Sequence, residues 1–153
     1  GVGTIGSLEE FSMEQIQVSI EVNLLSHLYV ARAVVPHFKK QGKGDLIFTG
    51  SEASLRGAAR GTLYCASKFG IRGMTQSPRQ ECSRNGVRVM GVHPGMVRTP
   101  FFDELSFEPG EDIDNAIAPE DVAKVISTML NMPRNMVVDE VELTPLKKVV
   151  QRK

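Results

Sequence analysis

The residues best suited to chemistry lie in one short stretch, residues 45–68, which holds a hydroxyl, a phenol and an ammonium group. Clustered apolar residues over 45–49 predict a short buried strand, and the pattern after the following glycines predicts a helix. Tyr64 and Lys68 are four residues apart, so their side chains leave the same face of that helix. Ser51 follows the strand at its C-terminal end, which is where open parallel sheets bind their ligands.

Together these three groups can hold an oxygen atom and move a proton. A tyrosine with an unperturbed pKa of about 10 transfers protons poorly at neutral pH unless a cation favours its ionised form. Lys68 supplies such a cation, and Ser51 can hydrogen-bond an oxygen on which charge develops. Each residue also has an ordinary interpretation, as a turn serine, a packed helical tyrosine and a solvated lysine. The pattern Y-x-x-x-K is by itself a weak signal.

A long apolar helix is expected before this stretch. Ser12 and Gln15 can form a capping box at its start, and Gly42 and Gly44 close the segment before the first strand. Two apolar stripes run along the helix, which predicts that one side lies on the sheet and the other on a further helix or a second subunit. Asn23 lies in the middle, where an unpaired amide would cost about 1–3 kcal/mol, so it needs a partner. Backbone or water would serve.

A second helix is expected over Thr62–Arg84, with Asn85-Gly86 as its stop signal. Pro78 interrupts its second half and would cost about 3 kcal/mol in a straight helix. A strand over Val87–Val92 follows, and His93-Pro94-Gly95 ends it. The loop after this strand therefore opens onto the same crevice as Ser51.

The last third of the chain predicts one irregular segment, a third helix and a final strand. Residues 100–118 fit either a mobile flap over a pocket or an ordinary surface loop that packs its own aromatics. Pro119–Leu130 is the expected helix, Val137–Leu143 the strand, and Lys147–Lys153 a solvated basic tail. The residues of the irregular segment that can line an apolar pocket are Phe101, Phe102, Leu105 and Phe107.

Several motifs in one order point to a known family. Ser51 lies thirteen residues before Tyr64, V-N-L occupies 22–24, and P-G-M-V-R-T occupies 94–99. In this order and at these spacings, the motifs resemble the short-chain dehydrogenase/reductase family along essentially the whole chain. The resemblance implies an α/β fold, the C-terminal part of a doubly wound parallel-sheet Rossmann fold with three αβα layers. It also implies an NAD or NADP cofactor and a small-molecule carbonyl or alcohol substrate.

The family's functional residues fall on matching positions of this chain. By resemblance, the catalytic residues are Asn23, Ser51, Tyr64 and Lys68, with no metal. Lys68 would hold the nicotinamide ribose as well as tune the tyrosine, and Asn23 would hold a water that carries protons toward the lysine. Also by resemblance, the cofactor-binding residues are Tyr64, Lys68, Pro94, Gly95, Val97 and Thr99.

The chain departs from the family pattern at its beginning. It starts at Gly1, where the family's Asn-Asn-Ala-Gly stretch would end, and it contains no G-x-x-x-G-x-G. A strand, glycine-rich loop and helix that would bind pyrophosphate are therefore missing from these residues. The expectation is that the chain is the C-terminal part of a longer NAD(P)-dependent oxidoreductase and is inactive alone. The alternative is a non-enzymatic remnant that acts only by subunit association.

Composition bears on the domain organisation, the partners and the cellular setting of the protein. The 153 residues are 41% hydrophobic, which suits one domain over residues 1–146 followed by the tail 147–153. Eighteen basic and eighteen acidic residues give zero net charge, which argues against nucleic-acid partners. No apolar run of about 18 residues is evident, so no membrane span is expected. The two cysteines indicate a reducing, cytoplasmic setting. A homo-dimer or homo-tetramer through the first two helices is expected.

Overall fold

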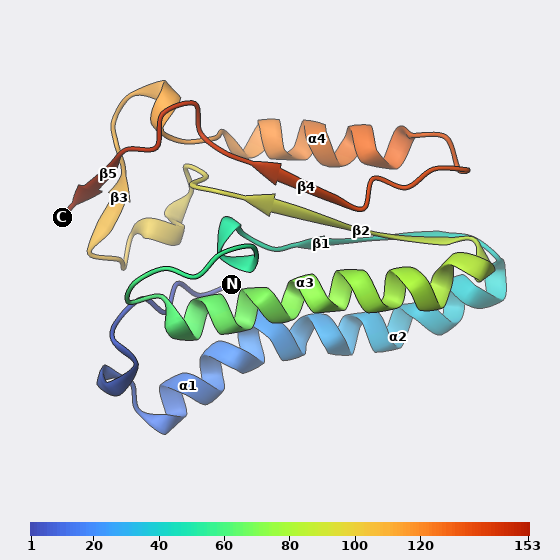
Figure 1. Ribbon diagram of the computed structural model, residues 1–153, viewed down its shortest axis with the longest axis horizontal. Helices are drawn as coiled ribbons and strands as arrows, with labels where there is room; N and C mark the ends of the chain where they lie inside the picture. Colours follow the sequence, from blue (N-terminus) through green and yellow to red (C-terminus); the bar gives the residue numbers. More distant parts are fainter.

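The computed structural model describes residues 1–153 and has a three-stranded parallel sheet between two layers of helices (Figure 1). The strands lie in the order β1 (Gly44–Thr49), β2 (Val87–Pro94) and β4 (Glu140–Leu143). Both strand pairs are parallel, with Thr49 opposite Val92 in the first and Gly91 opposite Glu140 in the second. The predicted α/β class with parallel strands is confirmed, although β4 begins three residues later than the sequence pattern indicated.

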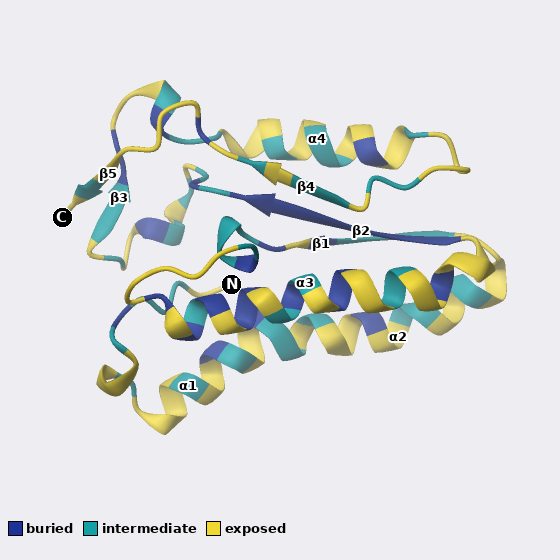
Figure 2. Ribbon diagram, viewed as in Figure 1, coloured by how far each residue is buried: buried dark blue, intermediate teal, exposed yellow.

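Helices cover both faces of the sheet. α2 (Ser26–Gln41) and α3 (Thr62–Cys82) lie on one face, and α4 (Pro119–Asn131) lies on the other (Figure 1). α1 (Met13–Ile20) extends the line of α2 and contacts α3. Because side chains alternate along a strand, Val87 and Val89 of β2 pack under α2 and α3, while Met90 and Val92 pack under α4. β2 is therefore buried along its whole length (Figure 2).

A π-helical turn, η2 (Glu21–Leu25), joins α1 to α2. Its signature is the backbone N–H of Ser26, which donates to the carbonyl of Glu21 five residues earlier. The capping box predicted at Ser12 and Gln15 is present at the start of α1. The sequence pattern thus located the helix start, but the wider turn around Asn23 is visible only in the structure. Such turns often occur at functional sites.

Glycine ends the second long helix. α3 continues into a short 3₁₀ turn, η4 (Ser83–Asn85), and Gly86 follows with a φ of 69°. A side chain there would be strained, and its Cβ would also collide with the carbonyl of Gly42. Pro78 lies inside α3, and the helix runs through it. Nothing in the structure assigns this proline a function.

The C-terminal residues correct one prediction. The sequence predicted a solvated tail over Lys147–Lys153, but Val150–Arg152 forms the strand β5, which pairs antiparallel with β3 (Phe107–Pro109). Arg152 lies opposite Phe107, and the backbone N–H of Lys153 donates to the carbonyl of Ser106. The tail therefore belongs to the folded unit, because it completes a two-stranded ribbon with the irregular segment.

One helical segment meets a membrane criterion that the sequence analysis did not find. By length and composition alone, Met13–Gln41 is long and apolar enough to cross a bilayer. The search for one uninterrupted apolar run missed it because polar residues are scattered through the segment. A single helix of this kind is weak evidence for a span, since the packed core helices of soluble proteins meet the same criterion.

A buried arginine ties the sheet to α4. Arg88 is 3% exposed and donates to Asp45 at 2.6 Å and to the carbonyls of Leu130 and Met132 at 2.9 Å. The first bond joins β2 to β1, and the other two satisfy carbonyls at the C-terminal end of α4.

We predict that Arg88→Met lowers the free energy of unfolding by about 3 kcal/mol, because it leaves buried acceptors without a donor. The control is Arg79→Met, which removes a pair with Asp139, a residue whose side chain is 65% exposed. That change should cost no more than about 1 kcal/mol. Urea titrations of both variants test the prediction, and equal losses would contradict it.

Candidate active site

Ser51 is held in a tight turn where β1 ends. Its Oγ accepts a hydrogen bond from the backbone N–H of Ala53 at 3.2 Å, and its own N–H donates to Ser54 Oγ at 3.0 Å. The turn begins at Gly50, whose N–H donates to the carbonyl of Val92 on β2. A Cβ at Gly50 would collide with the His93 ring and with Ser54 Oγ. Only glycine therefore allows the serine to approach the end of β2 so closely.

Tyr64 and Lys68 lie one turn apart on α3, as their spacing predicted. The ammonium Nζ of Lys68 lies 5.8 Å from the centre of the Tyr64 ring. Lys68 is only 7% exposed, and no acidic side chain pairs with it. The structure thus brings Ser51, Tyr64 and Lys68 to the same end of the sheet.

Burial controls the ionisation of the tyrosine and the lysine. Burial raises the pKa of Tyr64 above its ordinary value, and the nearby Ser51 hydroxyl opposes that rise only in part. Burial also lowers the pKa of Lys68. The net pKa shift of Tyr64 in the protein alone is therefore upward, because desolvation outweighs the lowering by Ser51.

Asn23 is fully buried and is bonded to the first residues of the chain. Its Oδ1 accepts from the N–H of Val2 at 2.8 Å, and its Nδ2 donates to the carbonyl of Val2 at 2.9 Å. A Cβ at Gly1 would collide with Asn23 and lie 3.9 Å from Lys68 Nζ. The side chain therefore fixes the N-terminal segment beside Lys68. This matches the ordinary interpretation of a core asparagine bonded to backbone.

The loop after β2 forms another wall of the site. The N–H of Gly95 donates to the carbonyl of Leu143 on β4, which holds the loop against the sheet. Thr99 Oγ1 donates to the carbonyl of Val97 at 3.3 Å and accepts from the N–H of Phe101 at 3.4 Å. Pro94, Gly95, Val97 and Thr99 all border the same cavity as Ser51 and Tyr64.

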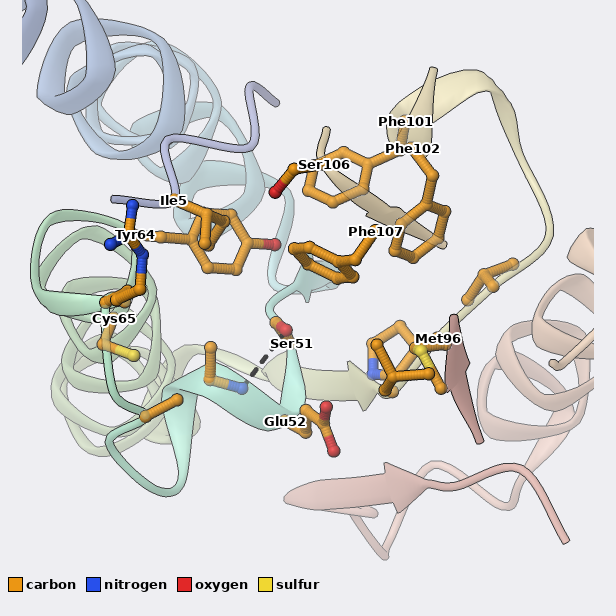
Figure 3. Close-up of a pocket in the computed structure, with 18 of the residues that line it drawn as sticks. Ile5, Ser51, Glu52, Tyr64, Cys65, Met96, Phe101, Phe102, Ser106 and Phe107 are labelled. Atoms are coloured by element: carbon orange, nitrogen blue, oxygen red, sulfur yellow. Dashed lines mark hydrogen bonds between the residues drawn. The ribbon is translucent and has the colours of Figure 1, made fainter. Parts of the chain in front are cut away.

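This cavity has a volume of about 780 Å³, and the hydroxyls of Ser51 and Tyr64 share it with an apolar wall. Tyr64, Ser51 and the phenylalanines point into one space from separate elements (Figure 3). Ring centres are 5.9 Å apart for Tyr64 and Phe101, 5.2 Å for Phe101 and Phe102, and 5.9 Å for Phe102 and Phe107. Of the four residues predicted to line an apolar pocket, these three phenylalanines do so. Leu105 instead packs near Gly3.

His93 is a residue that the sequence analysis did not single out. It is fully buried on β2, and neither ring nitrogen has a hydrogen-bond partner. Its ring lies against Gly50, directly behind the turn that carries Ser51. Burial lowers the pKa of His93 below its ordinary value. The sequence carried no signal that His93 would lie against Gly50, because that contact depends on how β2 aligns with β1.

Comparison with known proteins identifies the family. The family model for short chain dehydrogenases matches residues 1–109. The chain is 30% identical over 146 residues to an uncharacterized oxidoreductase of Staphylococcus saprophyticus, covering 95% of this chain and 61% of the relative. It is 37% identical over 103 residues to a hydroxysteroid dehydrogenase of Mycobacterium tuberculosis, covering 67% of this chain and 40% of the relative. The chain belongs to the short-chain dehydrogenase family, as its motifs indicated.

Solved structures support the same fold. An alcohol dehydrogenase from the archaeon Thermococcus sibiricus, complexed with 5-hydroxy-NADP, superposes with a TM-score of 0.83 at 28% identity. The match covers 97% of this chain and 62% of that protein. A metagenomic short-chain oxidoreductase in complex with NADP gives a TM-score of 0.77 at 28% identity, covering 97% of this chain and 59% of that one. The chain spans between 40% and 62% of the length of the curated relatives it matches.

We predict a loss of stability between pH 7 and pH 5.5 that depends on His93. Burial lowers the pKa of His93 in the folded state, whereas in the unfolded state the side chain keeps its ordinary pKa of about 6.5. As the pH falls below that value, the unfolded state takes up more protons than the folded state, so acid favours unfolding. His93→Gln should flatten this part of the stability profile. The exposed His37→Gln serves as the matched control. Denaturant titrations across the range test this, and an unchanged slope in His93→Gln would contradict it.

Proposed function

We propose that these residues form the catalytic part of an NAD(P)-dependent oxidoreductase that interconverts a carbonyl group and an alcohol. The observation that carries the proposal is the convergence of Ser51 and Tyr64 in one apolar cavity, with Lys68 one helical turn away. Membership of the short-chain dehydrogenase family and the nicotinamide dinucleotides named with its structural neighbours support it.

The hydroxyls of Ser51 and Tyr64 act on the substrate oxygen. When bound, the reduced nicotinamide supplies a hydride, which carries two electrons to the carbonyl carbon. Tyr64 donates the proton that the oxygen then needs, and Ser51 stabilises the charge that develops on that oxygen. In the reverse direction, Tyr64 accepts the proton of the alcohol. The apolar wall excludes water from both steps, which strengthens the hydrogen bonds made there.

Lys68 and the loop after β2 are the proposed holders of the cofactor. The buried ammonium group of Lys68 has no acidic partner, so it is available to a ribose hydroxyl. Pro94, Gly95, Val97 and Thr99 border the cavity at the ends of the strands, where a nicotinamide ring would lie. NAD and NADP both fit these contacts.

Asn23 is still proposed to take part in proton transfer, through the backbone of its turn rather than through its side chain. Because its side-chain amide is bonded to Val2, a water that relays protons toward Lys68 would bind the backbone of the π-helical turn. The side chain then acts as a positioning group for this turn.

The 153 residues taken alone are proposed to be inactive. They hold the nicotinamide end of the site but no glycine-rich loop at a helix N-terminus, which would bind the pyrophosphate. The edge of β1 away from β2 is also unpaired in the sheet. The proposed setting is cytoplasmic, which the free thiols of Cys65 and Cys82 support.

Subunit association is the second proposed function. Large apolar side chains are exposed on α1, η2, α2 and α3, and Tyr29 and Val30 are 68% and 58% exposed. A second copy of the chain, packing helix against helix in a homo-dimer or homo-tetramer, would cover them. The exposed large apolar residues of these helices are Met13, Val18, Val22, Leu28, Tyr29, Val30 and Phe69.

We predict that Tyr64→Phe in the full-length protein lowers kcat at least about a thousandfold and leaves the Kd for NADP or NAD nearly unchanged, because only the proton donor is lost. Lys68→Met should differ by weakening cofactor binding as well as turnover. Steady-state kinetics and fluorescence titration of the cofactor measure both. Turnover retained in Tyr64→Phe, or an unaltered cofactor Kd in Lys68→Met, would refute the respective role.

We predict that the full-length protein sediments as a dimer or tetramer. Exchanging the exposed Tyr29 and Val30 together for lysine should shift it toward monomer, because like charges would face each other across the interface. The control exchanges Leu146, an exposed apolar residue outside these helices, for lysine and should leave the assembly intact. Analytical ultracentrifugation reports the state, and a monomeric unaltered protein would count against association.

A further inference from the structure

The strand β5 places one arginine on the wall of the cavity. Because side chains alternate along a strand, Val150 and Arg152 border the cavity while Gln151 does not. Arg152 lies directly opposite Phe107 of β3, which borders the cavity as well. The guanidinium group is therefore presented beside the aromatic wall by two paired strands.

Arg152 is the only charged residue on this cavity that has no partner. The other three are Glu52, Arg60 and Lys153, and each is bonded to a group of opposite charge. Lys153 also donates to the carbonyls of Phe102 and Asp103. Arg152 makes neither an ion pair nor a side-chain hydrogen bond. Glu52 pairs with Lys148 at 2.6 Å, Arg60 with Glu10 at 3.1 Å, and Lys153 with Glu108 at 3.7 Å.

Apart from the hydroxyls of Ser51, Tyr64, Thr99 and Ser106, the uncharged part of the wall is largely apolar. Phe101, Phe102, Phe107, Met96 and Ile5 contribute to it, and the cavity is wide enough for a ring-sized group as well as a nicotinamide ring. The phenylalanines lie across the cavity from Ser51 (Figure 3). β3 and β5 form a ribbon beyond the C-terminal edge of the sheet, apart from α3, which carries Tyr64 (Figure 1).

We propose, building on the function given above, that the substrate is a carbonyl compound or alcohol with an apolar body and one anionic group. Arg152 binds the anion, whose chemistry is that of a carboxylate. Arg152 is exposed, so its guanidinium group is free to meet an incoming anion, and a guanidinium fork matches the two oxygens of a carboxylate. The anion lies at the far end of the apolar body from the reacting carbonyl, because Arg152 and Ser51 stand on different walls. A cationic substrate is disfavoured by the same charge.

The test compares aryl keto acids with their neutral counterparts on the full-length protein saturated with cofactor. 4-Acetylbenzoate, 4-acetylphenylacetate and 3-(4-acetylphenyl)propionate place the carboxylate beyond the ring at increasing distance from the ketone, and each is matched by its primary amide. Calorimetric titration gives the Kd of each compound without requiring turnover. We expect at least one of the longer acids to bind about tenfold more tightly than its amide, as one charge-assisted hydrogen bond provides.

Three variants test whether Arg152 causes the preference for the acid over the amide. Arg152→Gln should remove the difference between acid and amide, and Arg152→Lys should restore part of it. Arg84→Gln changes an exposed arginine without an ion pair in η4, at the opposite edge of the sheet, and should leave the preference intact. Equal binding of acid and amide by the unaltered protein, or a preference that survives in Arg152→Gln, would overturn the proposal.

Turnover of the acids and amides is measured separately from their binding. If neither acids nor amides are reduced or oxidised, the proposed oxidoreductase function fails, while the binding contrast still decides whether Arg152 recognises an anion. If both are turned over with equal KM and equal Kd, the oxidoreductase function stands and the role of Arg152 falls.

Discussion

The site depends on one constraint, that three parallel strands end at a common edge of the sheet. Thr49 of β1 lies opposite Val92 of β2, and the next N–H, that of Gly50, donates to the Val92 carbonyl. Gly95 makes the corresponding bond to Leu143 on β4. These bonds fix where each strand stops, so the turn with Ser51 and the loop after Pro94 border one cavity. A shift of a single residue in either pairing would turn the inward side chains to the opposite face.

Desolvation is the physical effect that shapes the chemistry of this edge. It raises the pKa of Tyr64 and lowers those of Lys68 and His93, so each of these groups is driven toward its neutral form. The ionisation of Tyr64 also depends on the charged residues of the cavity, such as Glu52, and on the charge of whatever binds there. This fits a family whose cofactor changes its charge during the reaction, because the phenol would ionise most readily beside the oxidised ring.

The ribbon of β3 and β5 contributes Phe107, Val150 and Arg152 to the wall of the cavity. The proposed catalytic groups come from α3 and from the turn that follows β1, whereas the aromatic wall and Arg152 come from segments that lie outside the parallel sheet. The pairing of Phe107 with Arg152 also couples the two segments, so the wall and its charge are held in place together.

The sequence by itself determined the helices, the parallel strands, the capping box at Ser12 and the spacing of Ser51, Tyr64 and Lys68, since these follow from local periodicity and from motifs. Tertiary structure decided the rest. The bonds of Asn23 to Val2, the burial of His93 behind Gly50 and the pairing of β5 with β3 join residues far apart in the chain. Their pairing depends on strand register and packing, and the ionisation of Tyr64 depends on the burial that results. Local sequence patterns carry no information on either, because both arise from contacts made only when the chain has folded.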